Sequence, residues 1–174
     1  MPELAEEIRR VTINSSLRAY AMRRKNIYRG RWIRFGGWWP DWITRLFIKG
    51  EAQFNDRVIH EALQVKAPVG KITNPLLHYS FLSAGDFVER AHRYSIHAAP
   101  DMYREGRRAT LWTAVSHSLF TLFKFYILRL GVLEGGAGVL IAVSNCVGCF
   151  YRYMILRELS IGRPDADAEN HVKK

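Results

Sequence analysis

The residues best suited to chemistry gather in one short stretch of the chain, Gly36–Trp42, whose sequence is GGWWPDW. Two adjacent glycines, Gly36 and Gly37, let the backbone reach positive φ and come close to a bound molecule. The tryptophans beside them, Trp38 and Trp39, offer flat faces that stack on sugar rings. Three tryptophans, a proline and a carboxylate within five residues are unusual for a routine turn. The stretch therefore predicts a carbohydrate-binding site, with a loop packed on the core as the alternative.

Side chains further along the chain could bind anions or metal ions. Arg45 carries a guanidinium, and its bidentate fit to phosphate suits a phosphorylated ligand. His78 follows a proline and two leucines, and imidazole suits Mn or a similar ion. A lone histidine beside an apolar strand is more often a satisfied core residue, so both interpretations of His78 stay open.

Charge is distributed unevenly over the 174 residues. Lysine and arginine exceed aspartate and glutamate by 26 to 16, for a net charge of +10. Such an excess seeks phosphate in a nucleotide, in nucleic acid or on an anionic membrane. Nucleic acid is the least favoured, because zinc-ligand spacing and an RNA-binding aromatic signature are lacking. No acid occurs between Glu7 and Asp41, whereas nine basic residues do: Arg9, Arg10, Arg18, Arg23, Arg24, Lys25, Arg29, Arg31 and Arg34.

Size and cysteine content indicate a small cytoplasmic protein. A chain of this length forms one domain, or one domain with an appendage, and buries a substantial core. Cys146 and Cys149 form a C-x-x-C, but no second pair follows and the surroundings are apolar, so we expect two buried small residues. Two cysteines and a polar, basic N-terminus without a signal peptide indicate a reducing compartment.

The elements that must position these residues fall into two halves. Residues 2–10 carry acids early and arginines late, which suits a helix and its dipole. The rest of the first half mixes aromatic, basic and apolar residues and predicts short strands. We expect these strands at 19–33 around a bend at Asn26, at 44–48 and at 52–54, with a loop or edge strand at 65–73.

The second half is predicted to be helical. Ser83 and Asp86 have the spacing of a capping box and begin an amphipathic helix over 86–97, which Pro100 ends or bends. Apolar residues at helical spacing continue beyond it. The expected parts are residues 1–82, a helical appendage over 83–163 with further helices at 108–130 and 135–157, and a polar, disordered tail over 164–174.

Two uncharged runs, at 109–123 and 135–151, point towards a membrane. The first falls short of the roughly 18 to 20 apolar residues that a span needs, and the second contains several glycines and Asn145. Basic residues beside aromatic ones such as Trp112 and Phe120 fit a helix lying in the interface of an anionic leaflet. A helical hairpin packed on the rest of the protein, or on a second subunit, explains the pattern equally well.

Four motifs follow one another between Tyr28 and Glu61: GRW at 30–32, GGWWPDW, RLF at 45–47 and HE at 60–61. Together they resemble inverting family 2 glycosyltransferases of the lipopolysaccharide core type, bacterial enzymes similar to the β-1,4-glucosyltransferases that modify inner-core heptose. The resemblance implies an α+β or α/β fold. This fold is the C-terminal part of a GT-A-like glycosyltransferase core with short mixed strands, followed by a helical appendage of two to three helices. Further agreement comes from PLLHYS at 75–80, RYS at 93–95 and YRY at 151–153.

The resemblance implies transfer of a hexose, with glucose expected, from a nucleotide sugar such as a UDP-hexose to the lipopolysaccharide inner core. Such a transfer needs a base, a cation at the leaving diphosphate and a surface that holds the sugar. Glu61 is similar to the family's base, Asp41 is the alternative, and a solvated Glu61 is the ordinary structural explanation. His78 would reach a divalent metal, Mn or Mg. The expected sugar- and phosphate-binding residues are Gly36, Gly37, Trp38, Trp39, Arg45 and His60, the last orienting Glu61.

One departure from the family changes the expectation. Family members begin with a nucleotide-binding half that ends in Asp-x-Asp, whereas the Asp-x-Asp here, Asp165 and Asp167, lies in the polar tail. We therefore expect the acceptor half of a transferase, truncated or separately encoded and inactive alone, or a homo-oligomer. Its expected partners are a nucleotide sugar, a lipid-linked oligosaccharide acceptor and an anionic membrane, and its expected location is the cytoplasmic side of the inner membrane. The alternative is a non-catalytic module or remnant that binds membrane or carbohydrate.

Overall fold

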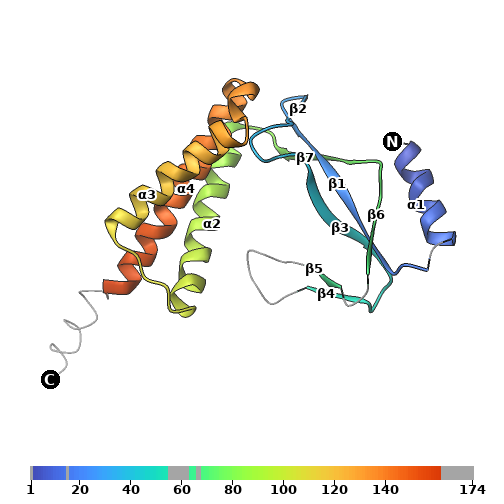
Figure 1. Ribbon diagram of the computed structural model, residues 1–174, viewed down its shortest axis with the longest axis horizontal. Coiled ribbons are helices and arrows are strands. Elements are labelled where there is room, and N and C mark those ends of the chain that lie inside the picture. Colours follow the sequence, from blue (N-terminus) through green and yellow to red (C-terminus); the bar gives the residue numbers. More distant parts are fainter. Residues whose placement is uncertain (1, 15, 55–62, 66–67, 162–174) are drawn as a thin grey trace.

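The computed structural model describes residues 2–14, 16–54, 63–65 and 68–161. The chain is α+β, as predicted. Helix α1 (Pro2–Asn14) lies at one end, a small mixed sheet in the middle, and a bundle of α2, α3 and α4 at the other end (Figure 1). The predicted boundary at residues 82 and 83 falls between the last strand and α2.

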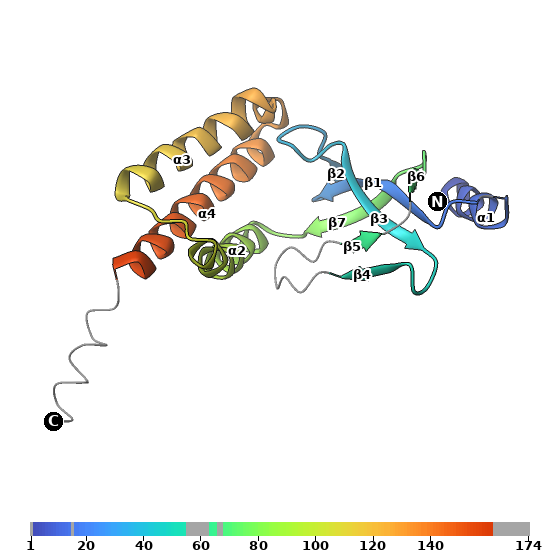
Figure 2. The same ribbon diagram turned by 60° about the horizontal axis from the view of Figure 1, so that its bottom comes forward.

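The sheet is built around one long central strand, β1 (Ala19–Tyr28). Two strands pair with β1 antiparallel and two pair with it parallel, and a separate two-stranded antiparallel sheet lies beside them (Figure 2). The antiparallel partners are β2 (Arg31–Trp32) and β3 (Asp41–Phe47), the parallel partners are β6 (Val69–Lys71) and β7 (Leu76–Phe81), and the separate pair is β4 (Ala52–Phe54) with β5 (Leu63–Val65).

Alternation along β1 sets its two faces. Tyr20 and Met22 point to one side, where they are buried with Leu4 of α1 and Ile72. The sequence predicted a bend at Asn26, and this prediction is wrong. The strand continues through Asn26 to Tyr28, because the buried Asn26 side chain finds hydrogen-bond partners within the sheet. The chain turns instead at positions 29 and 30, which both have positive φ.

Helix α1 is tied to the sheet by Glu7, a buried carboxylate. Glu7 accepts hydrogen bonds from the backbone N–H groups of Thr73 and Asn74 at 2.8 and 2.9 Å, and from the Asn74 amide at 2.8 Å. Burial alone would raise the pKa of Glu7, but these donors outweigh it and lower the pKa. These bonds, together with the packing of Leu4, hold α1 against one end of the sheet (Figure 1).

Helix α2 (Ala84–Arg104) begins at the predicted capping box, which is confirmed. The Asp86 carboxylate accepts from the N–H groups of Leu82 and Ser83 at 2.6 and 3.0 Å, and these bonds lower its pKa. Of the two outcomes predicted at Pro100, an end of the helix is wrong, and a bend stays a prediction. Residues on both sides of Pro100 are buried against α4, and this packing carries the helix on to Arg104.

The last two helices form a hairpin. Helix α3 (Leu111–Phe123) begins at a Thr110 cap and continues as a π-helical turn, η1 (Lys124–Leu128). A short 3₁₀ turn, η2 (Gly131–Glu134), leads into α4 (Gly136–Ile161). The turn is tight: a Cβ at Gly138 would overlap the carbonyl oxygen of Gly131.

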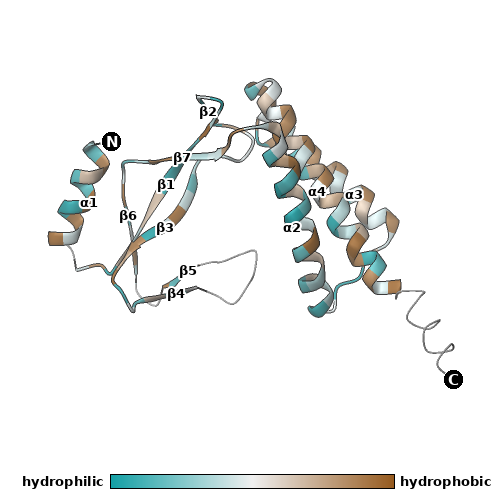
Figure 3. Cartoon of the chain, turned by 180° about the vertical axis from the view of Figure 1, so that it is seen from behind, coloured by the Kyte–Doolittle hydropathy of each residue, from teal (hydrophilic) through white to brown (hydrophobic). Residues whose placement is uncertain are grey.

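Both arms of the hairpin are long and apolar enough, by length and composition, to cross a membrane. The expectation that the first arm is too short needs correction, because the π-helical turn extends it to 18 residues, Leu111–Leu128. Most of its side chains are not covered by the rest of the chain. Figure 3 shows hydrophobic residues along α3 and α4 and more hydrophilic ones on α2.

Candidate functional site

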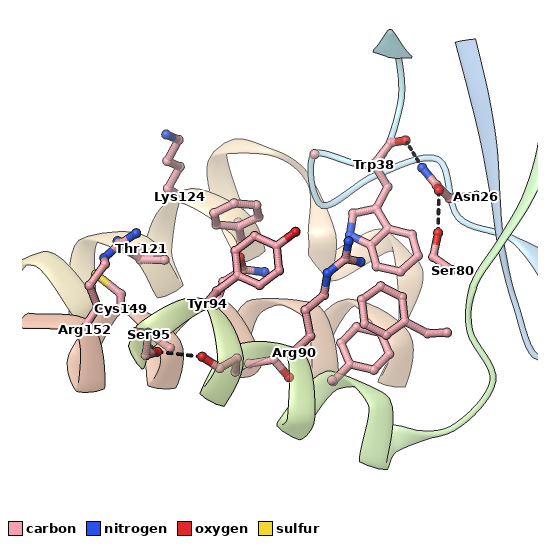
Figure 4. A pocket seen from close by; sticks show the side chains of 18 of the residues that line it. Asn26, Trp38, Ser80, Arg90, Tyr94, Ser95, Thr121, Lys124, Cys149 and Arg152 are labelled. Atoms are coloured by element: carbon pink, nitrogen blue, oxygen red, sulfur yellow. Dashed lines mark hydrogen bonds between the residues drawn. The ribbon is translucent and has the colours of Figure 1, made fainter. Parts of the chain in front are cut away.

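A cleft of 680 Å³ lies between the end of the sheet and the helical bundle. Two residues singled out in the sequence, Asp41 and His78, line its sheet end together. The other end is lined by α2, α3, η1 and α4. Figure 4 shows Asn26, Trp38 and Ser80 at one end, Thr121, Cys149 and Arg152 at the other, and Arg90 and Tyr94 between them.

Asn26 joins the polar groups at the sheet end of the cleft. It is 5% exposed and lies in β1 beside His78 of β7. Its Nδ2 donates to the Asp41 carboxylate and to the Trp38 carbonyl, each at 3.1 Å. Its Oδ1 accepts from the Ser80 hydroxyl at 2.8 Å and lies 3.0 Å from His78 Nδ1. One buried amide therefore fixes a carboxylate and an imidazole on its two sides.

This network sets the tautomer of His78. Two acceptors hold the amide nitrogen of Asn26, so its oxygen faces the imidazole and accepts a hydrogen bond from the N–H at Nδ1. The Ser80 hydroxyl also contacts Nδ1. Burial lowers the pKa of His78, the charge of Arg24 lowers it further, and the charge of Asp41 partly opposes both. His78 is thus held neutral at pH 7 with its lone pair on Nε2.

Asp41 reaches the cleft because it is the cross-strand partner of Arg24. The two residues face each other in the β1–β3 ladder, and Arg24 Nε donates to Asp41 Oδ2 at 2.7 Å. Asn26 donates to the same oxygen. Among the described residues, Arg24 and Asn26 thus both donate to Oδ2 of Asp41. Oδ1 can therefore accept a hydrogen bond from a ligand hydroxyl.

Trp38 forms one wall of the cleft. Its ring stacks at 5.3 Å on Phe81 and at 5.9 Å on Phe87, the first turn of α2. Phe81 and Phe87 themselves stack at 4.0 Å, and Tyr28 meets Phe87 edge to face. Trp38 is therefore packed against other aromatic side chains and also forms part of the wall of the cleft.

The two glycines serve packing within the chain. Gly36 and Gly37 have φ of 67° and 79°, as their positions in the turn require. Gly36 N–H donates to the Arg129 carbonyl at 2.8 Å, and a Cβ at Gly37 would overlap the Arg129 side chain. Gly37 also lines the cleft. The close approach that the glycines permit is thus to the helical hairpin.

Glu134 holds the GGWWPDW loop against the hairpin. This buried carboxylate in η2 accepts from the N–H groups of Arg34 and Phe35 at 2.7 and 3.0 Å. Its other oxygen accepts from the Arg31 guanidinium at 2.6 Å. The loop that carries Trp38 is therefore positioned by a residue about a hundred positions away in the chain.

Trp39 lies on the other side of β1 from the Asp41 network. It is not one of the described residues that line the cleft. Arg23, whose side chain alternates with that of Arg24, lies over the rings of Trp39 and Trp42 at 4.8 and 5.4 Å. Lys71 lies over Trp42 at 5.3 Å. The structure therefore separates Trp38 from Trp39 and places Trp39 in a cation–π cluster.

Three other predicted residues have different outcomes. Arg45 is exposed on β3 and lies outside the described cleft lining, although its charge helps to lower the pKa of His78. His60 and Glu61 lie outside the described residues, as does the tail with Asp165 and Asp167.

Sequence reasoning named few of the residues that line the cleft, and those it missed include Arg24, Asn26, Ser80, Arg90, Lys124 and Arg152. A signal for two of them was present. Arg24 and Asn26 continue the alternation of Tyr20 and Met22 along one strand, so four successive even positions share a face. Arg24 and Asn26 are polar, whereas Tyr20 and Met22, the earlier residues on the same face, are apolar. This change indicates that the core ends there and that a polar site begins.

The position of His78 is compatible with a ligand to a divalent metal. Its Nδ1 is held by Asn26, which is the arrangement that presents Nε2 to an ion. Within the described residues, no group of three or more histidine, cysteine, aspartate or glutamate side chains could hold a metal ion. A metal at His78 would need further ligands from a bound diphosphate or from elsewhere.

Comparison with known proteins assigns no family to the chain. No protein-family model matches it, and no solved structure matches it. The resemblance to family 2 glycosyltransferases therefore remains a prediction from motifs, and a function must be argued from the geometry of the cleft.

Proposed function

We propose that the chain provides the acceptor side of an inverting family 2 glycosyltransferase with a GT-A-like core. The reaction would move a hexose, glucose in the first instance, from a nucleotide sugar to the lipopolysaccharide inner core. One observation supports this proposal above the others. Asp41 and the neutral His78 flank Asn26 at the end of a cleft whose wall is the Trp38 ring.

Each part of the cleft has a task in such a transfer. The Trp38 ring supplies a flat face for a sugar, and Oδ1 of Asp41 accepts a hydrogen bond from the acceptor hydroxyl. Asp41 or Glu61 takes the hydroxyl proton as the bond to the anomeric carbon forms. Arg24 keeps the Asp41 carboxylate oriented through its 2.7 Å bond.

His78 would hold a divalent ion, Mn or Mg, through Nε2. When bound, that ion neutralises the diphosphate leaving group. Asn26 and Ser80 keep the imidazole in the tautomer that this role needs.

Association with the cytoplasmic side of the inner membrane belongs to the same proposal. Five large apolar side chains follow one face of α3 and η1: Trp112, Leu119, Phe120, Phe123 and Ile127. Trp112 is 80% exposed, which is unusual for an indole. A continuous stripe of this kind indicates a surface that another apolar phase covers.

Calorimetric titration of the chain with UDP-glucose, with and without Mn, tests the donor side of the proposal. We expect binding that depends on Mn and is lost in His78→Ala, while His92→Ala, an exposed position on α2, binds like the unmodified chain. Binding of UDP-glucose without any effect of Mn or of His78→Ala would refute the role of His78. Absence of binding to the chain, and also to the chain mixed with a nucleotide-binding partner, would refute the transferase.

A non-catalytic membrane-binding module is the second candidate. The observation that favours it is the exposed apolar stripe on α3, because such a stripe could bind a membrane without any catalytic activity. Binding to anionic vesicles combined with no response to nucleotide sugars would favour this candidate over the first.

A further inference from the structure

Three cations that line the cleft lack a carboxylate partner among the described residues. Arg90 of α2, Lys124 of η1 and Arg152 of α4 all line the cleft. Among the described lining residues the one acid is Asp41, which is paired with Arg24. No carboxylate of the described residues forms an ion pair with any of the three cations. The helical end therefore carries uncompensated positive charge.

Arg152 is the one of the three with a buried nitrogen that has no hydrogen-bond partner among the described residues. Its Nε is shielded from solvent and has no hydrogen-bond partner in the part of the chain described. Its Nη2 makes a single weak contact, to Cys149 Sγ at 3.6 Å. Its guanidinium also lies 5.7 Å from the centre of the Tyr153 ring. The Arg152 guanidinium thus contacts a ring and a thiol, and one of its buried N–H groups has no acceptor among the described residues. Such a group is suited to binding an anion.

Arg90 is held in the cleft by rings and not by acids. Its guanidinium lies 4.9 Å from the centre of the Phe81 ring and 5.4 Å from that of Tyr94. Such stacking on ring faces orients the fork and leaves its N–H groups able to bind an anion. Lys124 is the first residue of the π-helical turn, a local widening that is frequent at functional sites.

Apolar side chains adjoin these cations. Phe120 and Phe125 line the same end of the cleft, and Phe120 is also 57% exposed on the outer stripe of α3. A ligand could thus place its charged group among the cations and its apolar part along Phe120. A free anion would use only the first of these two features.

We propose that the helical end of the cleft binds the phosphate ester of an amphiphile, with Arg152 as its main ligand, Lys124 at the same end and Arg90 further along the cleft towards the sheet (Figure 4). Phosphate fits better than carboxylate, because several cations in one cleft match a group that carries more than one negative charge and several acceptor oxygens. Identifying this amphiphile as the lipid-linked acceptor rests on the proposed function, whereas phosphate binding itself does not.

Calorimetry with three probes tests the inference without any nucleotide sugar or metal. The probes are dihexanoyl phosphatidic acid, dihexanoyl phosphatidylcholine and inorganic phosphate, the lipids being kept below micelle-forming concentrations. We expect phosphatidic acid to bind most tightly, inorganic phosphate more weakly and phosphatidylcholine least. Arg152→Gln should weaken phosphatidic acid binding about tenfold or more, since a charge-assisted bond is lost.

The matched control is Arg157→Gln, on the same helix but outside the described cleft lining, which should change the affinity less than about twofold. Arg152→Lys and Lys124→Gln, with urea unfolding of every variant, keep the test valid if Arg152→Gln does not fold. An equal loss in Arg157→Gln, or no binding of either phosphate probe, would overturn the site. Equal affinity for inorganic phosphate and phosphatidic acid would overturn the assignment to an amphiphile. Phosphatidic acid binding is measured without nucleotide sugar or metal, so failure here is distinguishable from failure of the proposed transferase.

Discussion

Asn26 determines the geometry of the sheet end of the cleft. Its amide nitrogen binds Asp41 and the Trp38 carbonyl, while its amide oxygen faces Ser80 and His78. Because donors and acceptors are used on opposite sides of one planar group, no other residue of the same size satisfies all four partners. Asp41 and His78 were both singled out from the sequence. They are held next to each other in the cleft by Asn26, which was not singled out as a site residue.

Replacing Asn26 with aspartate tests this dependence. The variant keeps the shape but places an oxygen against the Trp38 carbonyl and the Asp41 carboxylate. We expect a loss of about 2–3 kcal/mol in the free energy of unfolding, measured by urea denaturation, because two buried acceptors lose their donor. Asn14→Asp, at the exposed end of α1, should cost less than about 0.5 kcal/mol. Similar losses in the two variants would show that Asn26 is not a buried hub.

The neutral state of His78 predicts a pH dependence of stability. Burial and the charge of Arg24 lower its pKa below the ordinary value of 6.5, so the unfolded chain binds more protons than the folded one as the pH falls below 6.5. The contribution of His78 to stability is therefore present above pH 6.5 and is lost as the pH falls towards its folded pKa. The lowered pKa values of Glu7 and Asp86 act below their ordinary values of 4.5 and 3.8, outside this window.

The measurement is the free energy of unfolding of the chain and of His78→Gln between pH 7.5 and 5. We expect the free energy of unfolding of the unmodified chain to decrease as the pH is lowered from 7.5 to 5. The decrease should be smaller in the variant. His92→Gln should follow the unmodified chain. A His78→Gln profile parallel to that of the unmodified chain would contradict the assignment of a neutral, buried imidazole.

Residue roles were predictable only where the residue type itself carries the chemistry. Asp41, His78 and Trp38 stand out by type and do line the cleft. Gly36 and Gly37 also stand out, yet the surface that they approach is the hairpin around Arg129, more than ninety residues later. The separation of Trp38 from Trp39 follows from the path of the loop, which Glu134 fixes over a similar distance in the chain.

At the scale of elements, the hairpin between α3 and α4 is the part that holds loop, sheet and bundle together. Glu134 in its turn binds the loop, and Ile141 of α4 packs with Ile33 of the sheet region. The turn depends on close backbone contact between Gly131 and Gly138. Any side chain at Gly138 must therefore push α4 away from the turn.

Gly138→Ala is expected to destabilise the chain although alanine favours helices. The new methyl group would overlap the Gly131 carbonyl oxygen, and neither backbone segment can move freely. We expect a net loss of about 2–3 kcal/mol by urea denaturation, even after the roughly 1 kcal/mol that alanine gains over glycine inside a helix. Gly136→Ala, two residues earlier in open space, should be neutral or stabilising. A stabilised Gly138→Ala would mean that the turn is looser than described.

Local signals predicted where elements begin better than where they end. The Ser83 capping box and the strand at 52–54 are found where expected, because each depends on neighbouring residues. The extension of α2 beyond Pro100 depends on burial of Ala99 and Met102 against α4. The parallel pairing of β6 and β7 with β1 joins segments about fifty residues apart and left no pattern in the sequence.

At the scale of the whole molecule, the polar cleft opens between a cationic sheet region and an apolar hairpin. The stripe on α3 has no cover among the described residues, and Phe120 belongs both to this stripe and to the cleft. If a membrane covers this stripe, as proposed, an amphiphilic ligand would be presented to the cleft along the same surface. This arrangement connects the phosphate site with the proposed location at an anionic leaflet.

Membrane binding through this stripe is testable with charged substitutions. Leu119 and Phe123 are 59% and 48% exposed on α3, so Leu119→Glu and Phe123→Glu should leave the fold intact while opposing insertion into a lipid interface. We expect each to weaken co-sedimentation with phosphatidylglycerol-containing vesicles about tenfold, because each removes exposed apolar area that insertion would bury and adds like charge at an anionic surface. Ile13→Glu is the matched control, since Ile13 is 79% exposed on α1 at the opposite end of the molecule.

Salt separates insertion from simple charge attraction in the same assay. Apolar insertion should retain much of the binding at 0.5 M NaCl, because salt screens attraction to the leaflet but not the transfer of side chains out of water. Binding that disappears with salt and is indifferent to Leu119→Glu would assign the membrane contact to the basic residues alone. If vesicles do not bind at all while the chain self-associates, and Phe123→Glu abolishes that association, the stripe is a protein interface and the membrane location is wrong.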